Sequence, residues 1–189
     1  MSPSFSFSSI FIVFLVLNFH AVNGDLISDV CNKASAAPIT KSPSALAVPY
    51  DFCVASLSAN PASKDADLMG LGAISLEKCA ENAESVDNDI SQLLRTGKAE
   101  QEAKPILHAC SLYNYGPADR AVRQAMEDFK NKDYGNAEMK LKSALPAPLL
   151  CEERFTEGGV ASPLTKQNGD FYRLTSISLA ITDMINVTE

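Results

Sequence analysis

The sequence predicts an all-α protein, an antiparallel bundle of helices preceded by an N-terminal helical hairpin. Apolar residues recur at helical spacing through most of the chain, and the connections between these stretches are short and marked by Gly or Pro. After the first 24 residues no long stretch alternates apolar and polar residues, so strands are not expected. The length of 189 residues suits one domain, and a hydrophobic fraction of 46% excludes a disordered chain.

Residues 1–24 are predicted to be a secretory signal peptide. Ile10 to Leu17 form an unbroken apolar run that is too short to span a bilayer, and Val22 and Gly24 place small residues before a cleavage site at Asp25. The mature chain, residues 25–189, is therefore expected to be secreted and to have no membrane span.

The clearest helical pattern runs from Asp67 to Leu94. Ser63 is the predicted N-cap, and Thr96-Gly97 is the predicted stop. One apolar stripe at 3.6-residue spacing defines the buried face. Its members are Leu68, Leu71, Cys79, Ala83, Val86, Ile90 and Leu93.

Further helices are predicted in the second half of the mature chain. One starts near Pro105 and is interrupted or kinked at Gly116-Pro117, and another follows over residues 121–129. A turn at residues 133–136 precedes the next helix, which Pro146 and Pro148 bend or restart. The stripe of the last helix comprises Leu174, Ile177, Ile181, Met184 and Ile185.

Export makes the five cysteines candidates for disulfide bonds. They are Cys31, Cys53, Cys79, Cys110 and Cys151, and none has the C-x-x-C spacing of a zinc or redox motif. Two bonds among five cysteines allow 15 arrangements, so counting does not select one. Cys79 lies on an apolar stripe and is predicted to be a buried, inert thiol.

The composition argues against several functions. A net charge of −7 without a basic block excludes a nucleic-acid partner. Only His108 remains after removal of the leader, so a zinc site with two or three histidines is excluded, and His108 does not face Cys110 at i, i+2. No nucleophile elbow or phosphate loop is present, and we expect no catalytic residue, metal or cofactor. A hydrolase with a carboxylate pair stays open as a minor alternative.

Several blocks carry a resemblance to a known family. In order they are YDFCVASL, which contains Cys53, then DADLMGLGAISL, ILHAC, DFKNKDYGNAEMKLKSAL, CEERF and SPLTKQNGDFYRLTSISLAI. Taken together, these blocks resemble the plant invertase/pectin methylesterase inhibitor family. The later blocks are especially similar to tree-pollen allergens of the invertase-inhibitor type.

The resemblance implies a four-helix up-down-up-down bundle over residues 61–189 and a helical hairpin over residues 25–60. It also implies disulfides between Cys31 and Cys53 and between Cys110 and Cys151, with Cys79 left as the free thiol.

The implied activity is one-to-one, non-covalent occlusion of the active-site cleft of a secreted plant enzyme in the apoplast. Acid invertase, a β-fructofuranosidase, is the expected target, and pectin methylesterase is the alternative. A secreted bundle without inhibitory activity is a further alternative.

The resemblance does not directly identify the residues that contact the target enzyme. The invertase branch presents Pro-Lys-Phe where this chain has Tyr134-Gly135-Asn136, so that role is not transferred. Tyr134 and Asn136 are the candidate contact residues, with Tyr113 and Tyr115 as further exposed candidates. Asn186-Val187-Thr188 is the only glycosylation sequon, close to the end of the chain.

Overall fold

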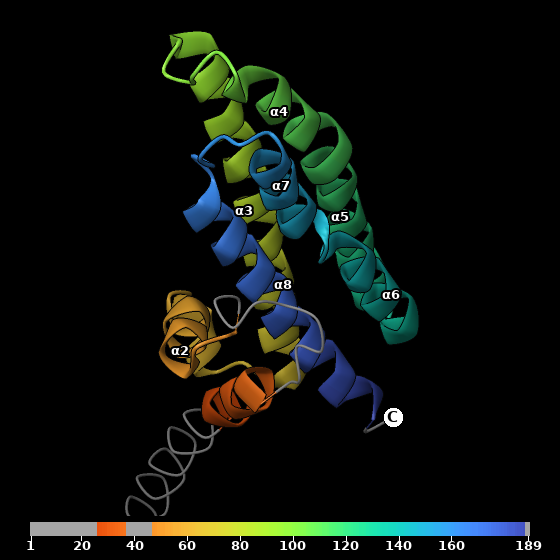
Figure 1. Cartoon of the computed structure of the whole chain (residues 1–189). Coiled ribbons are helices and arrows are strands. Elements are labelled where there is room, and N and C mark those ends of the chain that lie inside the picture. The colour runs from red at the N-terminus through yellow and green to blue at the C-terminus, as the bar shows by residue number, and fades with distance from the viewer. Residues whose placement is uncertain (1–25, 37–46, 188–189) are drawn as a thin grey trace, which may run out of the picture.

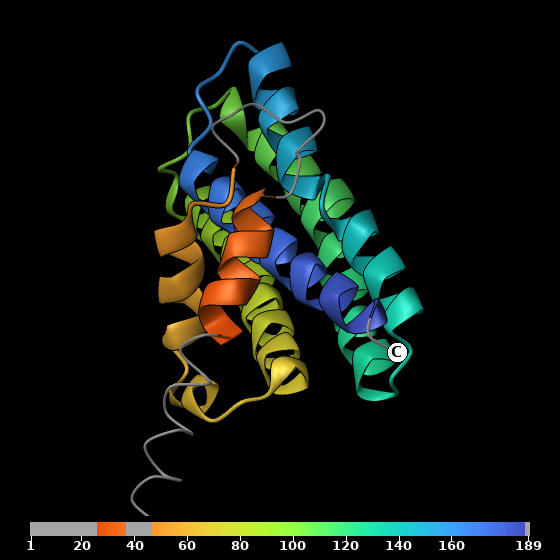
Figure 2. The ribbon, with the colours of Figure 1, turned by 90° about the horizontal axis from the view of Figure 1, so that it is seen from below.

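The computed structural model describes residues 26–36 and 47–187, and within them it confirms the all-α fold. The signal peptide predicted for residues 1–24 lies outside the described residues. Figures 1 and 2 show an elongated bundle with the N-terminal hairpin against one side. After a helical segment over residues 26–36, the elements are α2 (Tyr50–Ser58), the 3-10 helix η2 (Pro61–Lys64), α3 (Leu68–Thr96), α4 (Ala103–Ala109), the π-helix η3 (Cys110–Tyr115), α5 (Gly116–Lys130), α6 (Tyr134–Ala144), α7 (Ala147–Glu157) and α8 (Thr165–Asn186).

Helix α3 follows the predicted stripe, but it begins at a different cap. The Asp67 carboxylate accepts a hydrogen bond from the Gly70 N–H at 2.7 Å, which satisfies a free donor of the first turn. The prediction of Ser63 as the N-cap is wrong, because Ser63 lies in η2 and its hydroxyl donates to the Leu57 carbonyl at 2.6 Å. Gly97 ends the helix in the left-handed conformation, with φ of 69°.

Elements α4, η3 and α5 form one continuous helical column, so the chain is not interrupted at Gly116-Pro117, and the irregularity there takes the form of a π-type turn. The Gly116 N–H donates to the Ser111 carbonyl, five residues back, which closes a π-type turn. Pro117 follows directly, where the hydrogen bonding changes from the π to the α pattern, and it donates no hydrogen bond to the preceding turn. The wider turn absorbs the proline without breaking the column.

Helices α6 and α7 form a second divided column. Pro146 is the N-cap of α7 and Pro148 lies in its first turn, so the prolines restart the helix rather than bend it. The bundle therefore has four antiparallel columns, namely α3, α4–α5, α6–α7 and α8 (Figure 1).

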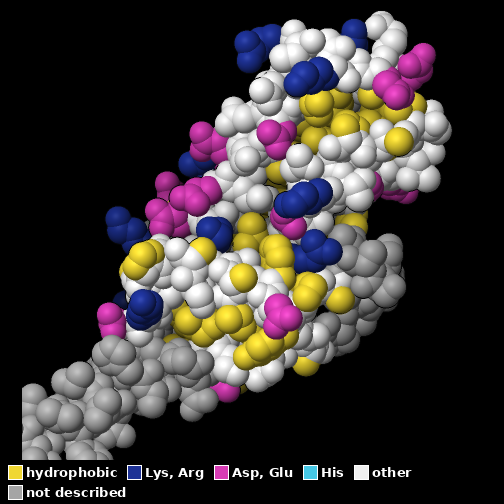
Figure 3. All heavy atoms as spheres, turned by 90° about the vertical axis from the view of Figure 1, so that its left-hand side faces the viewer, with side chains coloured by type: hydrophobic (Ala, Val, Ile, Leu, Met, Phe, Trp, Pro, Cys, Tyr) yellow, Lys and Arg dark blue, Asp and Glu magenta, His cyan; other side chains and the backbone are white. Residues whose placement is uncertain are grey.

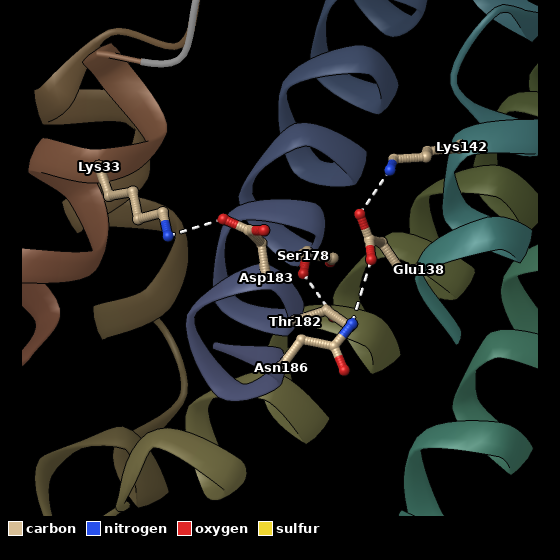
Figure 4. A network of polar contacts seen from close by, with 7 residues as sticks. All are labelled: Lys33, Glu138, Lys142, Ser178, Thr182, Asp183 and Asn186. Atoms are coloured by element: carbon tan, nitrogen blue, oxygen red, sulfur yellow. Dashed lines mark hydrogen bonds and ion pairs between the residues drawn. The ribbon is translucent and has the colours of Figure 1, made fainter. Parts of the chain in front are cut away.

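Two disulfides connect the helices in the pairing that the resemblance implies. The Cα atoms of Cys31 and Cys53 are 5.5 Å apart, and this bond joins the two helical parts of the hairpin. The Cα atoms of Cys110 and Cys151 are 5.2 Å apart, and this bond joins η3 to α7. The hairpin also contacts α8, where the Lys33 ammonium lies 2.7 Å from the Asp183 carboxylate (Figure 4).

Candidate functional site

The turn between α5 and α6 consists of three residues, Asn131 to Asp133. The Asp133 N–H donates to the Asp128 carbonyl at 2.9 Å, and the Lys132 N–H donates to the Phe129 carbonyl at 3.0 Å. This pair of bonds is the Schellman arrangement, in which glycine usually occupies the left-handed position. Lys132 occupies it here with φ of 62°, so the turn is tight and fixed while it holds a lysine in a costly conformation.

Asp133 also caps α6. Its carboxylate accepts a hydrogen bond from the Asn136 N–H at 3.2 Å and another from the Asn136 side-chain amide at 2.7 Å. Tyr134-Gly135-Asn136 is therefore the first turn of α6 rather than the predicted connecting turn, which lies three residues earlier. Asn136 is exposed, as a contact residue must be, although its amide also stabilises the cap.

Tyr134 is buried, with 3% of its surface exposed, which contradicts its prediction as an exposed contact residue. Its ring packs edge-on against Phe129, with the ring centroids 5.1 Å apart. Its hydroxyl donates to the Met69 sulfur at 3.0 Å. Tyr134 thus anchors the start of α6 to α5 and α3. Because its side chain is buried, it can affect a partner only indirectly, by fixing the position of the turn.

A groove lies beside this turn, between the beginning of α3 and the end of α5. It encloses about 460 Å³ and was not predicted from the sequence. Residues that line it come from positions 69–77 and 126–134, which only the tertiary fold brings together. The apolar lining residues are Met69, Ala73, Leu76, Met126, Phe129 and Tyr134, and the charged ones are Glu77, Lys130 and Lys132.

The other two candidate tyrosines have opposite environments. Tyr113 is 64% exposed on η3, and the Arg154 guanidinium lies 6.0 Å from the centre of its ring. Tyr115 is buried, which contradicts the prediction that it is exposed. Its hydroxyl donates to the Asn168 side-chain oxygen, and burial, together with the charge of Glu152, raises its pKa well above the usual value.

Cys79 is the free thiol and is completely buried. Its sulfur lies 3.1 Å from the Thr175 hydroxyl oxygen, and that hydroxyl donates to the Phe171 carbonyl at 2.8 Å. The thiol must therefore donate its own proton to Thr175. Burial raises the pKa of Cys79 from 9.0 to about 12, against a smaller opposing effect of the hydrogen bond. A buried and protonated thiol has little reactivity.

Asn186, the asparagine of the sequon, is exposed at the end of α8. Its side-chain amide donates to the Glu138 carboxylate at 3.1 Å, and Glu138 also pairs with Lys142 (Figure 4). The nitrogen that would carry a glycan is therefore engaged with α6. Thr188 of the sequon lies outside the described residues.

The described residues contain no group of three or more His, Cys, Asp and Glu side chains that could hold a metal ion. His108 lies exposed on α4. On the face drawn in Figure 3, acidic and basic side chains are interspersed rather than gathered by sign. Among the described helices, none has both the length and the apolar character needed to cross a bilayer.

Comparison with known proteins identifies the family. The sequence model of the plant invertase/pectin methylesterase inhibitor family matches residues 25–181. The chain belongs to this family. Its members are named as inhibitors of enzymes rather than as enzymes.

Individual relatives come from both branches of the family. A Platanus acerifolia protein named "Putative invertase inhibitor" is 38% identical over 186 residues, covering 98% of this chain and 99% of its own. The "Pectinesterase inhibitor 12" of Arabidopsis thaliana is 32% identical and covers 94% of this chain and 97% of its own. A crystal structure of a mutant pectin methylesterase inhibitor from Arabidopsis has a TM-score of 0.67 at 19% identity, covering 84% of this chain and 95% of its own. That likeness establishes the fold alone.

Proposed function

We propose that this chain is a secreted inhibitor of acid invertase that binds its target one to one and covers the active-site cleft without a covalent step. The observation that carries the proposal is the 38% identity to the Platanus protein over almost the full length of both chains. The 32% identity to the pectinesterase inhibitor makes pectin methylesterase the alternative target.

The turn between α5 and α6 is the surface that we assign to the contact. Asp133 caps α6, and the buried ring of Tyr134 fixes the turn to the rest of the bundle. A surface that is ordered before binding loses little conformational entropy on docking. The exposed positions that the turn offers to a partner are Lys132, Gly135 and Asn136.

Titration of the purified mature protein against acid invertase and against pectin methylesterase tests the target. We expect saturable loss of invertase activity at a one-to-one ratio, with pectin methylesterase activity unchanged. Loss of only the esterase activity would select the alternative target. No loss of either activity would indicate a bundle without inhibitory function, and turnover of sugar substrates by the protein alone would indicate a hydrolase.

Gly135→Arg tests the surface. A Cβ atom at Gly135 meets no other atom within 4 Å and the residue is exposed, so a large side chain there leaves the fold intact. We expect Gly135→Arg to weaken inhibition at least tenfold because the added side chain separates the two surfaces. The control is Gln92→Arg, an exposed position near the opposite end of α3. Equal inhibition by both variants would contradict the assignment of the turn.

A further inference from the structure

The groove beside the α5–α6 turn has the size of a small-molecule site. Its volume of about 460 Å³ falls within the range of about 300–1,000 Å³ that is common for ligand pockets. It is formed by α3, α5 and the start of α6, all of which belong to the ordered bundle. The inhibitory contact proposed above does not require anything to bind inside it.

The lining of the groove is mostly apolar, and its residues range from buried to exposed. Leu76, Tyr134 and Phe129 are 1%, 3% and 7% exposed, and they form its buried floor. Met69, which also lines it, is 41% exposed. Methionine side chains adapt to the shape of an apolar ligand because they are unbranched and have three rotatable bonds. Met69 and Met126 therefore add adaptable apolar surface to the groove, and the Met69 sulfur is held by the Tyr134 hydroxyl.

The charges at the groove are two lysines and one glutamate, Lys130, Lys132 and Glu77. Within the part of the chain that the structure describes, neither lysine forms an ion pair. Two unneutralised cations beside an apolar groove, on a protein of net charge −7, are suited to a ligand with one negative charge. Glu77 disfavours ligands with several negative charges.

The backbone at Lys132 supports the same conclusion. A non-glycine residue in the left-handed region is costly, and such residues concentrate where function requires them. Glycine would complete the same Schellman turn without the cost, but it would remove the ammonium group from the groove.

We propose that this groove binds a single-chain amphiphile with one anionic headgroup, such as a long-chain fatty acid. In this proposal the acyl chain packs on the apolar lining, which includes Leu76, Phe129 and the two methionines, and the carboxylate pairs with Lys130 and Lys132. This binding activity is different from enzyme inhibition, although it shares Lys132 with the surface that we assign to the enzyme contact.

A homologous series of saturated fatty acids, from octanoate to myristate below their micellar concentrations, tests the proposal by isothermal titration calorimetry. We expect the Kd to fall by up to about fourfold per added methylene until the chain fills the groove, and then to level off. We expect the primary alcohol of equal length to bind about fivefold more weakly, because it lacks the charge. No binding by any acid in the series would overturn the proposal.

Two variants separate the groove from non-specific adsorption. Ala73 is exposed and lines the groove, so Ala73→Phe fills the groove without entering the core, and we expect it to weaken laurate binding at least tenfold. Ser91→Phe adds the same ring at an exposed position elsewhere on α3, and its Kd should equal that of the wild type. Equal loss in both variants, or loss in neither, would contradict the site.

The headgroup end is tested by Lys130→Ala combined with Lys132→Gly. We expect this variant to bind laurate about fivefold more weakly and to bind dodecanol unchanged. An equal effect on both ligands would contradict the assignment of the carboxylate to these lysines. If laurate does not bind while Ala73→Phe abolishes inhibition of a target enzyme, the groove belongs to the enzyme contact and the amphiphile proposal fails.

Discussion

The hairpin and the bundle are held together by different means, although each contains one disulfide. Among the described residues of the hairpin, the buried apolar ones are few and mostly small, namely Val30, Cys31, Ala34, Val48, Cys53 and Leu57. In the bundle α3 packs along α8 and α5 along α6, with large side chains such as Phe155 and Phe171 fully buried. A disulfide of the same kind therefore compensates for a small core in the hairpin and reinforces a large core in the bundle.

The largest loss of stability is expected from removal of the bundle disulfide with Cys110→Ala and Cys151→Ala. The bond closes 41 residues, and its removal releases chain entropy in the unfolded state worth about 4 kcal/mol. Because the core connects all four columns, the loss should be global. Urea unfolding followed by circular dichroism should show one transition at a lower midpoint. An unchanged midpoint would show that the core alone fixes η3 against α7.

Removal of the hairpin disulfide with Cys31→Ala and Cys53→Ala should cost slightly less and act locally. The bond spans 22 residues, which corresponds to about 3 kcal/mol. Hydrogen exchange should become faster in residues 26–36 and in α2, while α3, α5 and α8 keep their protection. Faster exchange throughout α3 and α8 would mean that the hairpin and the bundle unfold as one unit.

Alkaline pH should destabilise the bundle through Cys79, which joins α3 to α8 by its contact with Thr175. The folded pKa of about 12 lies above the usual 9.0, so the protonated thiol is favoured in the folded state. This contribution is fully present below pH 9 and is lost as pH rises toward 12, at about 1.4 kcal/mol per unit. The free energy of unfolding should fall more steeply with pH in the wild type than in Cys79→Ala. Equal slopes would contradict the raised pKa.

The smallest effect is expected at the ion pair between the hairpin and α8. Lys33 and Asp183 are about half exposed, so Lys33→Ala should cost less than about 1 kcal/mol. Amide hydrogen exchange in residues 26–36 should be slightly faster in Lys33→Ala than in the wild type. Added salt should reduce this difference between the two proteins. Arg123→Ala removes an exposed pair with Asp119 on α5 and serves as the control, with no change expected in the hairpin. An equal effect of both variants would show that the Lys33 pair does not hold the hairpin.

The sequence predicts those features that local periodicity and caps determine. The stripe from Leu68 to Leu93 gave the length and buried face of α3, and Gly97 marked its end. It did not predict the buried state of Tyr134, because the sulfur that accepts its hydrogen bond belongs to Met69, 65 residues earlier. The burial of Tyr115 was not predicted for the same reason, since its partners Asn168 and Phe171 lie on α8.

The candidate site was predictable only in outline. Resemblance directed attention to residues 134–136, and Asn136 is exposed there. The groove requires residues from three helices, and no pattern along the chain indicates which exposed methionine will face which lysine. A left-handed lysine likewise has no sequence signature, because the position normally favours glycine.

The π-type turn at Cys110–Tyr115 gives this helical column one place where its length can change. A π turn is equivalent to one residue inserted into an α-helix. The side chains before and after the insertion keep the directions that they would have in the uninterrupted helix. Deleting one residue between Cys110 and Gly116 would close the column into regular turns and leave Leu107 and Val122 directed toward the same core. A deletion within α3 would instead rotate every later residue of that helix by about 100° and expose its apolar stripe. Among relatives of this chain, single-residue gaps should therefore gather at this turn.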